Sequence, residues 1–174
     1  MKLNGALTLT PGVQPPLERP RRRSHRPLYC PAVTLSTRTL VALRELAAEA
    51  PVTVTVAGDC MTPTLRSGDR VRVIRAKVLW PGDIVTFQRA DGRLLVHRML
   101  GYTLGSHGLS LLARGDHLSR EDEPVRLDRV VGRVIECEGS PLSTSMGQRW
   151  RCAVECLRTL LRRSVRSWVS APSS

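Results

Sequence analysis

A turn-forming stretch between two alternating segments constrains the fold of this chain more than any other feature. Residues 52–56 alternate valine with threonine, and residues 70–74 alternate arginine with apolar side chains. This period of two is typical of half-buried β-strands. Residues 58–69 between them contain two glycines, Pro63 and a cysteine, Cys60. A stiff turn between two strands fixes the direction of any side chain it presents, so Cys60 is a candidate reactive group.

Four later segments also have strand patterns, namely residues 83–88, 93–102, 108–114 and 129–137. Turn signals that contain glycine, and in one case proline, precede the first three of them, at residues 81–82, 90–92 and 105–108. Six short strands with little helix between them predict a mainly β fold, built as a coiled antiparallel sheet or a partly closed barrel.

A helix is expected before the first strand. Residues 36–50 begin with a capping residue, Ser36 or Thr37, and carry one apolar stripe formed by Leu40, Leu43, Leu46 and Ala47. This helix could be the first half of a DNA-binding helix pair. However, Pro51 ends it and a strand pattern follows at once, so the sequence leaves no room for a second helix.

A second helix is expected near the other end of the chain, over residues 149–170. Its apolar positions recur at intervals of three and four, with arginines at other positions: Trp150, Val154, Leu157, Leu161, Val165 and Trp168. This pattern is that of a basic amphipathic helix. It suits contact with a membrane surface, and it equally suits docking on its own domain or on a partner.

These elements divide the chain into four parts. Residues 1–34 are rich in proline and arginine and are expected to be disordered. Residues 35–138 form the predicted domain, residues 139–148 a linker, and residues 149–170 the amphipathic helix.

The charge distribution indicates an anionic partner. The chain has 27 Lys and Arg residues against 15 acidic ones, and the arginines crowd the two ends. No base-reading motif supports nucleic-acid binding. No apolar run is long enough for a transmembrane helix, and residues 1–7 do not form a signal-peptide core. We therefore expect a cytoplasmic protein, with peripheral attachment to the inner face of the membrane as the alternative.

The five cysteines do not predict a disulfide framework, because their number is odd and no export signal is present. Cys152 and Cys156 lie one helical turn apart and could both bind one metal ion. With no ligand pair at zinc-ribbon spacing, burial as small apolar side chains is the simpler interpretation. We expect no metal and no cofactor.

Five motifs in order resemble the type I signal peptidase and LexA-like peptidase superfamily, in its smaller, non-bacterial-type branch. They are Gly58-Asp59-Cys60-Met61-Thr62-Pro63-Thr64-Leu65-Arg66-Ser67-Gly68-Asp69, Pro81-Gly82-Asp83-Ile84-Val85-Thr86-Phe87, Val96-His97-Arg98, Arg114-Gly115-Asp116 and Val130-Val131-Gly132-Arg133-Val134. The resemblance covers about residues 52–136. It implies the same coiled antiparallel sheet.

The resemblance also implies a catalytic set. Cys60 lies where the family has its catalytic serine, and His97 lies where its eukaryotic and archaeal members have a catalytic histidine. Asp116 matches the aspartate of the Lys-Gly-Asp motif and is expected to orient the histidine, with Asp122 as the second acidic candidate. A cysteine keeps the role of nucleophile chemically possible, because its thiol ionises far more readily than an alcohol.

The function implied is that of an endopeptidase that cleaves a dedicated peptide or protein substrate by a Cys/His(/Asp) covalent mechanism. Ordinary signal peptidases carry a membrane anchor before the nucleophile, and this sequence has none, so bulk secretory precursors are not the expected substrate. The competing hypothesis is a catalytically inactive peptidase fold that binds peptides. His25, His107 and His117 have no partner pattern and are not expected to be catalytic.

Overall fold

The structure is mainly β, with one curled antiparallel sheet and two helices. This computed structural model describes residues 33–105 and 108–169, with side chains described to residue 164. Its elements are α1 (Thr37–Glu49), β1 (Val52–Thr55), β2 (Arg70–Ile74), β3 (Ile84–Gln88), β4 (Leu94–Gly105), β5 (Gly108–Arg114), β6 (Val125–Arg126), a 3-10 turn (Leu127–Arg129), β7 (Val130–Cys137), β8 (Ser140–Pro141) and α2 (Met146–Val169). Nearly all of the predicted N-terminal tail, residues 1–34, lies outside the described residues.

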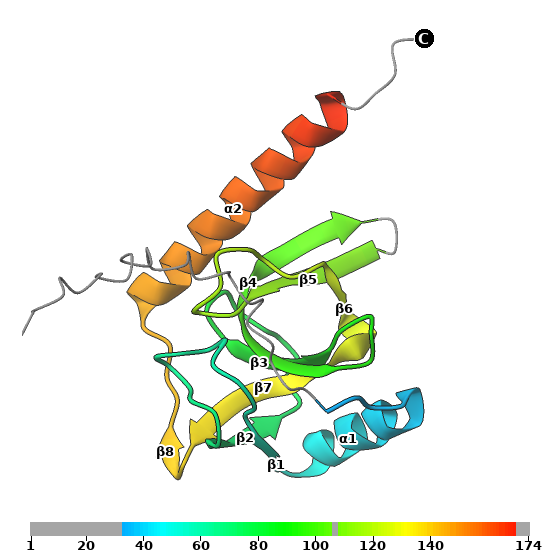
Figure 1. Cartoon of the computed structure of the whole chain (residues 1–174), viewed down its shortest axis with the longest axis vertical. Helices are drawn as coiled ribbons and strands as arrows, with labels where there is room; N and C mark the ends of the chain where they lie inside the picture. Colours follow the sequence, from blue (N-terminus) through cyan, green and yellow to red (C-terminus); the bar gives the residue numbers. More distant parts are fainter. Residues whose placement is uncertain (1–32, 106–107, 170–174) are drawn as a thin grey trace, which may run out of the picture.

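The sheet confirms the predicted mainly β, antiparallel class. Its strands follow the order β1-β2-β7-β3-β4-β5-β6, with β8 paired to β7, and every pairing is antiparallel. Figure 1 shows the sheet curling into a half-barrel, with α1 at one end and α2 along the other side. All six predicted strands are present. The two strands that the sequence did not predict, β6 and β8, have two residues each.

Helix α1 confirms the predicted helix and its cap. The side chain of Ser36 accepts a hydrogen bond from the backbone N–H of Thr39 at 3.1 Å, which satisfies one open donor of the first turn. Leu40 and Ala47 are buried against the sheet, whereas Leu46 is exposed. Strand β1 starts three residues after α1 ends, so α1 is followed by a strand and not by a second helix.

The apolar core has three parts. One lies between α1, β1, β2 and β7 and includes Cys60; a second lies among β3, β4, β5 and β7; the third joins α2 to β4 and β5. In the third, Cys152 and Cys156 pack with Leu100 and Leu112. Gly101 is required there, because a Cβ atom on it would lie 2.6 Å from the Cys156 sulfur.

Both helix cysteines are therefore buried small side chains. Burial raises the pKa of both thiols. In the part of the chain that the structure describes, no three His, Cys, Asp or Glu side chains are grouped to hold a metal ion. Over the same residues, no helix combines the length and the apolar character needed to cross a membrane.

Candidate active site

Cys60 is held by a tightly bonded loop between β1 and β2. The backbone N–H of Val56 donates to the carbonyl of Asp69 at 2.8 Å, so the two ends of the loop are closed on each other. Gly58 adopts φ +82°, a conformation that favours glycine, and its N–H donates to the Ser67 hydroxyl at 3.2 Å. Met61 and Leu65 anchor the loop in the core. The loop fixes the position of Cys60, as its sequence predicts.

Cys60 lies at a mostly apolar groove of about 390 Å³. The lining comes from residues 53–57 and Cys60, from Thr39 and Leu43 of α1, from Val33 and Leu35, and from residues 94–96 of β4. Cys60 itself is only 4% exposed. The apolar surface of the groove therefore extends to Cys60.

Two strand edges border this groove. In the described residues β1 pairs with a strand on one side only, and β4 pairs with β5 only from Arg98 onward. Residues 33–35 cover the start of β4: Thr34 bridges Arg93, and the N–H of Leu94 donates to the carbonyl of Val33 at 2.9 Å. Such edges can form main-chain hydrogen bonds with an added peptide strand.

His97 follows the groove-lining residue Val96 on β4. It pairs with Val85 of β3 and is 2% exposed, and its ring meets the ring of Phe87 edge-on at 6.0 Å between centroids. Its Nδ1 atom lies 2.6 Å from Oδ2 of Asp122. A carboxylate at Nδ1 fixes the ring orientation and leaves Nε2 as the atom for proton exchange with a substrate or nucleophile.

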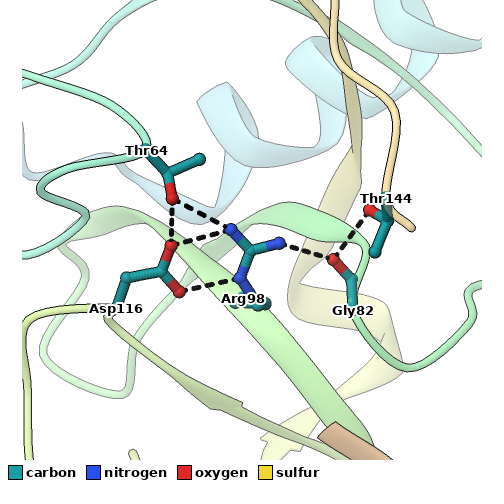
Figure 2. Close-up of polar contacts among 5 residues, drawn as sticks. All are labelled: Thr64, Gly82, Arg98, Asp116 and Thr144. Atoms are coloured by element: carbon teal, nitrogen blue, oxygen red, sulfur yellow. Dashed lines mark hydrogen bonds and ion pairs between the residues drawn. The ribbon is translucent and has the colours of Figure 1, made fainter. Parts of the chain in front are cut away.

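Asp116 is bonded to Arg98, and the carboxylate beside the ring of His97 is that of Asp122, so the structure does not support the prediction that Asp116 orients the histidine. Both of its carboxylate oxygens are used by Arg98, whose Nε and Nη2 atoms each donate at 2.7 Å. The Thr64 hydroxyl donates to the same carboxylate at 2.5 Å (Figure 2). The physical reason is geometric. A guanidinium can donate two parallel hydrogen bonds to one carboxylate, and Arg98 lies close enough to Asp116 to do so. The acidic partner of His97 is Asp122, the second candidate.

Figure 2 also shows how Arg98 is fixed from its other side. Its Nη1 atom donates to the carbonyl of Gly82 at 2.9 Å, and the Thr144 hydroxyl donates to the same carbonyl at 3.1 Å. Arg98 thereby joins the loop that carries Cys60, the turn before β3 and the segment before α2. No sequence pattern predicted this role of Arg98, although the arginine lies inside the Val-His-Arg motif.

Residues 115–122, which we call the bridging loop, connect the parts of the site. Near its start, the backbone N–H of His117 donates to the carbonyl of Cys60 at 2.9 Å. At its end, Asp122 meets His97 and is held by a hydrogen bond from its own N–H to the carbonyl of Ala113, at 2.8 Å. Gly115 permits the close approach, because a Cβ atom there would lie 2.6 Å from the carbonyl oxygen of Cys60.

Asp69 and Asp83, which each follow a glycine in one of the motifs, have different surroundings. Asp69 accepts from the N–H of Arg66 at 2.8 Å, as a turn residue does. Asp83 accepts from the N–H of Trp80 at 2.9 Å but is also buried and lies 3.0 Å from Arg149 of α2. Of the other histidines, only His117 is described; its side chain is exposed.

Comparison with known proteins adds no identification. No protein-family model matches the chain, and no curated protein matches it significantly. The structure by itself defines a curled antiparallel sheet with a buried His–Asp pair, joined through one loop to a cysteine at an apolar groove.

Proposed function

We propose that this protein is an endopeptidase of the signal-peptidase-like type, with Cys60 as nucleophile and His97 as general base. In this proposal Asp122 is the carboxylate that orients the base. The observation that carries the proposal is the His97–Asp122 pair, tied by the bridging loop to the carbonyl of Cys60. A nucleophile, a base and an orienting group are the parts that covalent peptide cleavage needs. The five ordered motifs of the sequence support the same assignment.

The expected substrate is an extended peptide. In the described residues the outer edge of β1 is unpaired, and the edge of β4 between Leu94 and Arg98 lies between two paired segments; both border the groove, so a peptide can add there as a strand. The groove is mostly apolar, which favours small or apolar side chains next to the cleaved bond. The preference of signal peptidases for small residues before the cut is consistent with this choice.

The reaction proceeds in two steps. The Cys60 sulfur forms a bond to the scissile carbonyl carbon as its proton passes to His97, and the carbonyl oxygen becomes an oxyanion that a backbone N–H can stabilise. Collapse breaks the C–N bond, and the histidine gives its proton to the leaving amine. Water then attacks the thioester with His97 as base, which releases the acid and restores the thiol.

The test is covalent labelling with peptide chloromethyl ketones that carry small residues before the warhead. We expect mass spectrometry to find the adduct on Cys60, and we expect His97→Ala to slow its formation about 10²–10⁴-fold, the usual contribution of a general base. Cys137→Ala is the matched control, because it removes a partly buried thiol outside the site and should leave the rate unchanged. Labelling that ignores His97, or that favours other cysteines, would show the catalytic assignment to be wrong.

One observation favours a second function, a peptide-binding module without chemistry. Cys60 is almost completely buried and belongs to an apolar cluster, as structural cysteines do. In that case the protein should bind small-residue peptides and form no adduct, and Cys60→Ala should bind them equally well. Titration with a fluorescent peptide, run beside the labelling experiment, separates the two functions.

A further inference from the structure

Helix α2 has two apolar faces, and only one of them packs on the domain. The inner face carries Cys152, Cys156 and Thr159, which are buried at β4 and β5. Ion pairs of Glu155 with Arg114 and of Arg163 with Glu121 fasten the helix to β5 and to the bridging loop. The helix therefore docks on its own domain, through residues that were not part of its predicted apolar stripe.

The predicted stripe faces outward. Three of its described members, Trp150, Leu157 and Leu161, are 73%, 58% and 58% exposed, and Met146, at the start of the helix, is 79% exposed. Their separations of four, seven and four residues place them on one side of a helix with 3.6 residues per turn. Of the other predicted members, Val154 is partly buried, and Val165 and Trp168 have side chains outside the described part. A helix rarely exposes so many large apolar side chains in one row unless the row has a partner.

A row of arginines runs beside this stripe. Arg151, Arg158 and Arg162 each follow one stripe residue directly in the sequence, so they lie about 100° further round the helix. All three are exposed. The one acidic residue of α2, Glu155, is paired with Arg114. The partner of this surface must therefore offer an apolar layer next to negative charge.

We propose that the outer face of α2 binds the surface of an anionic lipid bilayer. Such a surface offers acyl chains for the apolar stripe and phosphate groups for the arginines, whose stems can extend along the boundary. Trp150 suits the same boundary, because tryptophan is amphipathic and concentrates at membrane–water interfaces. The inner face of α2 holds the domain on another side of the helix, so the stripe can enter lipid without unpacking the fold. The proposal does not depend on the peptidase chemistry.

The first test is flotation of the full-length protein with vesicles. We expect binding to phosphatidylcholine vesicles that contain a quarter phosphatidylglycerol, weaker binding to pure phosphatidylcholine, and loss of affinity with added salt. Leu157→Ser combined with Leu161→Ser should weaken binding at least tenfold, because two apolar side chains no longer enter lipid. The matched control is Leu104→Ser, an exposed leucine on β4. Equal binding by the double variant and the control would overturn the proposal.

Charge is tested in the same assay. Changing Arg151, Arg158 and Arg162 together to glutamine should weaken binding to the anionic vesicles about 100-fold, from about fivefold per arginine near the surface. Arg38→Gln, on the exposed surface of α1, is the control and should have a much smaller effect. Undiminished binding by the triple variant would assign vesicle attraction to another part of the chain and would also overturn the proposal.

A second measurement tests whether α2 itself enters lipid. The chain has three tryptophans, so replacing Trp80 and Trp168 by phenylalanine leaves Trp150 as the reporter. Vesicles with brominated acyl chains should quench its fluorescence, and unbrominated vesicles should shift its emission to shorter wavelength. Absence of quenching while the protein is bound would contradict insertion of the stripe. A dimer in lipid-free light scattering that Leu157→Ser abolishes would instead identify a second copy as the partner.

Discussion

Two consecutive residues of β4 each take an aspartate from the bridging loop, and the two pairs have different chemistry. His97 meets Asp122 at 2.6 Å, and Arg98 meets Asp116 at 2.7 Å. Neighbouring residues of a strand point to opposite faces, so one loop reaches both sides of β4. An imidazole exchanges protons near neutral pH, whereas a guanidinium stays charged. A nearly identical contact can therefore hold a proton-exchanging group in one pair and a permanently charged group in the other.

The sharpest test of this difference is Asp122→Asn. The amide keeps the size of the side chain but can no longer stabilise the imidazolium or select the ring tautomer. We expect the rate of Cys60 labelling to fall about 10²–10⁴-fold, as expected for loss of the orienting carboxylate in a catalytic triad. Labelling kinetics at pH 7 measure it. If Asp116→Asn slows labelling by the same factor while the protein stays folded, the division of roles is wrong.

Asp116→Asn should mainly lower the stability of the protein. Both the arginine and the aspartate side chain are largely buried, and the substitution leaves Arg98 without its anionic partner. Breaking one side of a buried ion pair costs about 3–5 kcal/mol. Urea denaturation, followed by circular dichroism, gives the change in the free energy of unfolding, with Asp128→Asn on an exposed ion pair as the matched control.

The same variant has a predicted pH dependence. Burial acts to raise the pKa of the Asp116 carboxyl, but hydrogen bonds from Arg98 and Thr64 outweigh it, so the pKa lies below its ordinary value of 3.8. The stabilising contribution of this carboxylate is therefore fully present above pH 3.8 and is lost as the pH falls through the lower folded-state pKa. The stability difference between wild type and Asp116→Asn should shrink on acidification below about pH 4. A difference that grows on acidification would contradict this assignment.

The smallest expected effect is that of Thr64→Val. It removes the hydroxyl that donates to Asp116 and accepts from Arg98 at 3.2 Å. A loss of about 1–3 kcal/mol in the free energy of unfolding is expected, with little change in labelling rate once the protein is folded. Thr64→Ser keeps the hydroxyl and serves as the control. Equal stability of the valine and serine variants would show that the hydroxyl contributes nothing.

Strands β1 and β2 could be predicted because their side chains alternate, and the start of α1 because Ser36 is a strong cap. The two-residue strands β6 and β8 could not, since such short pairings depend on neighbours and have no period of their own. Helix α2 starts at Met146, inside the predicted linker, where the Ser145 hydroxyl accepts from the N–H of Gln148 at 3.2 Å. Helix propensity does not predict that α2 starts at Met146, because Gly147 is a poor helix former.

The aspartates of the site show a different limit of sequence reasoning. Asp116 and Asp122 lie in one loop, and both are close enough in sequence to reach β4. Which one meets His97 is set by the pairing of Arg98 with Arg114, which fixes where the loop leaves the sheet. That register is a property of the folded sheet, and motif spacing does not determine it.

The burial of Asp83 bears on how this chain can be divided. Its carboxylate lies 3.0 Å from Arg149 and 3.7 Å from Arg133, so a helix residue and a strand residue share one buried charge. Cutting the chain before α2 would remove the nearer cation and uncover Leu100 and Leu112. A piece of the chain that keeps this interior closed must therefore include the part of α2 that packs on the sheet, and a boundary drawn at the predicted linker would separate residues that share one buried charge.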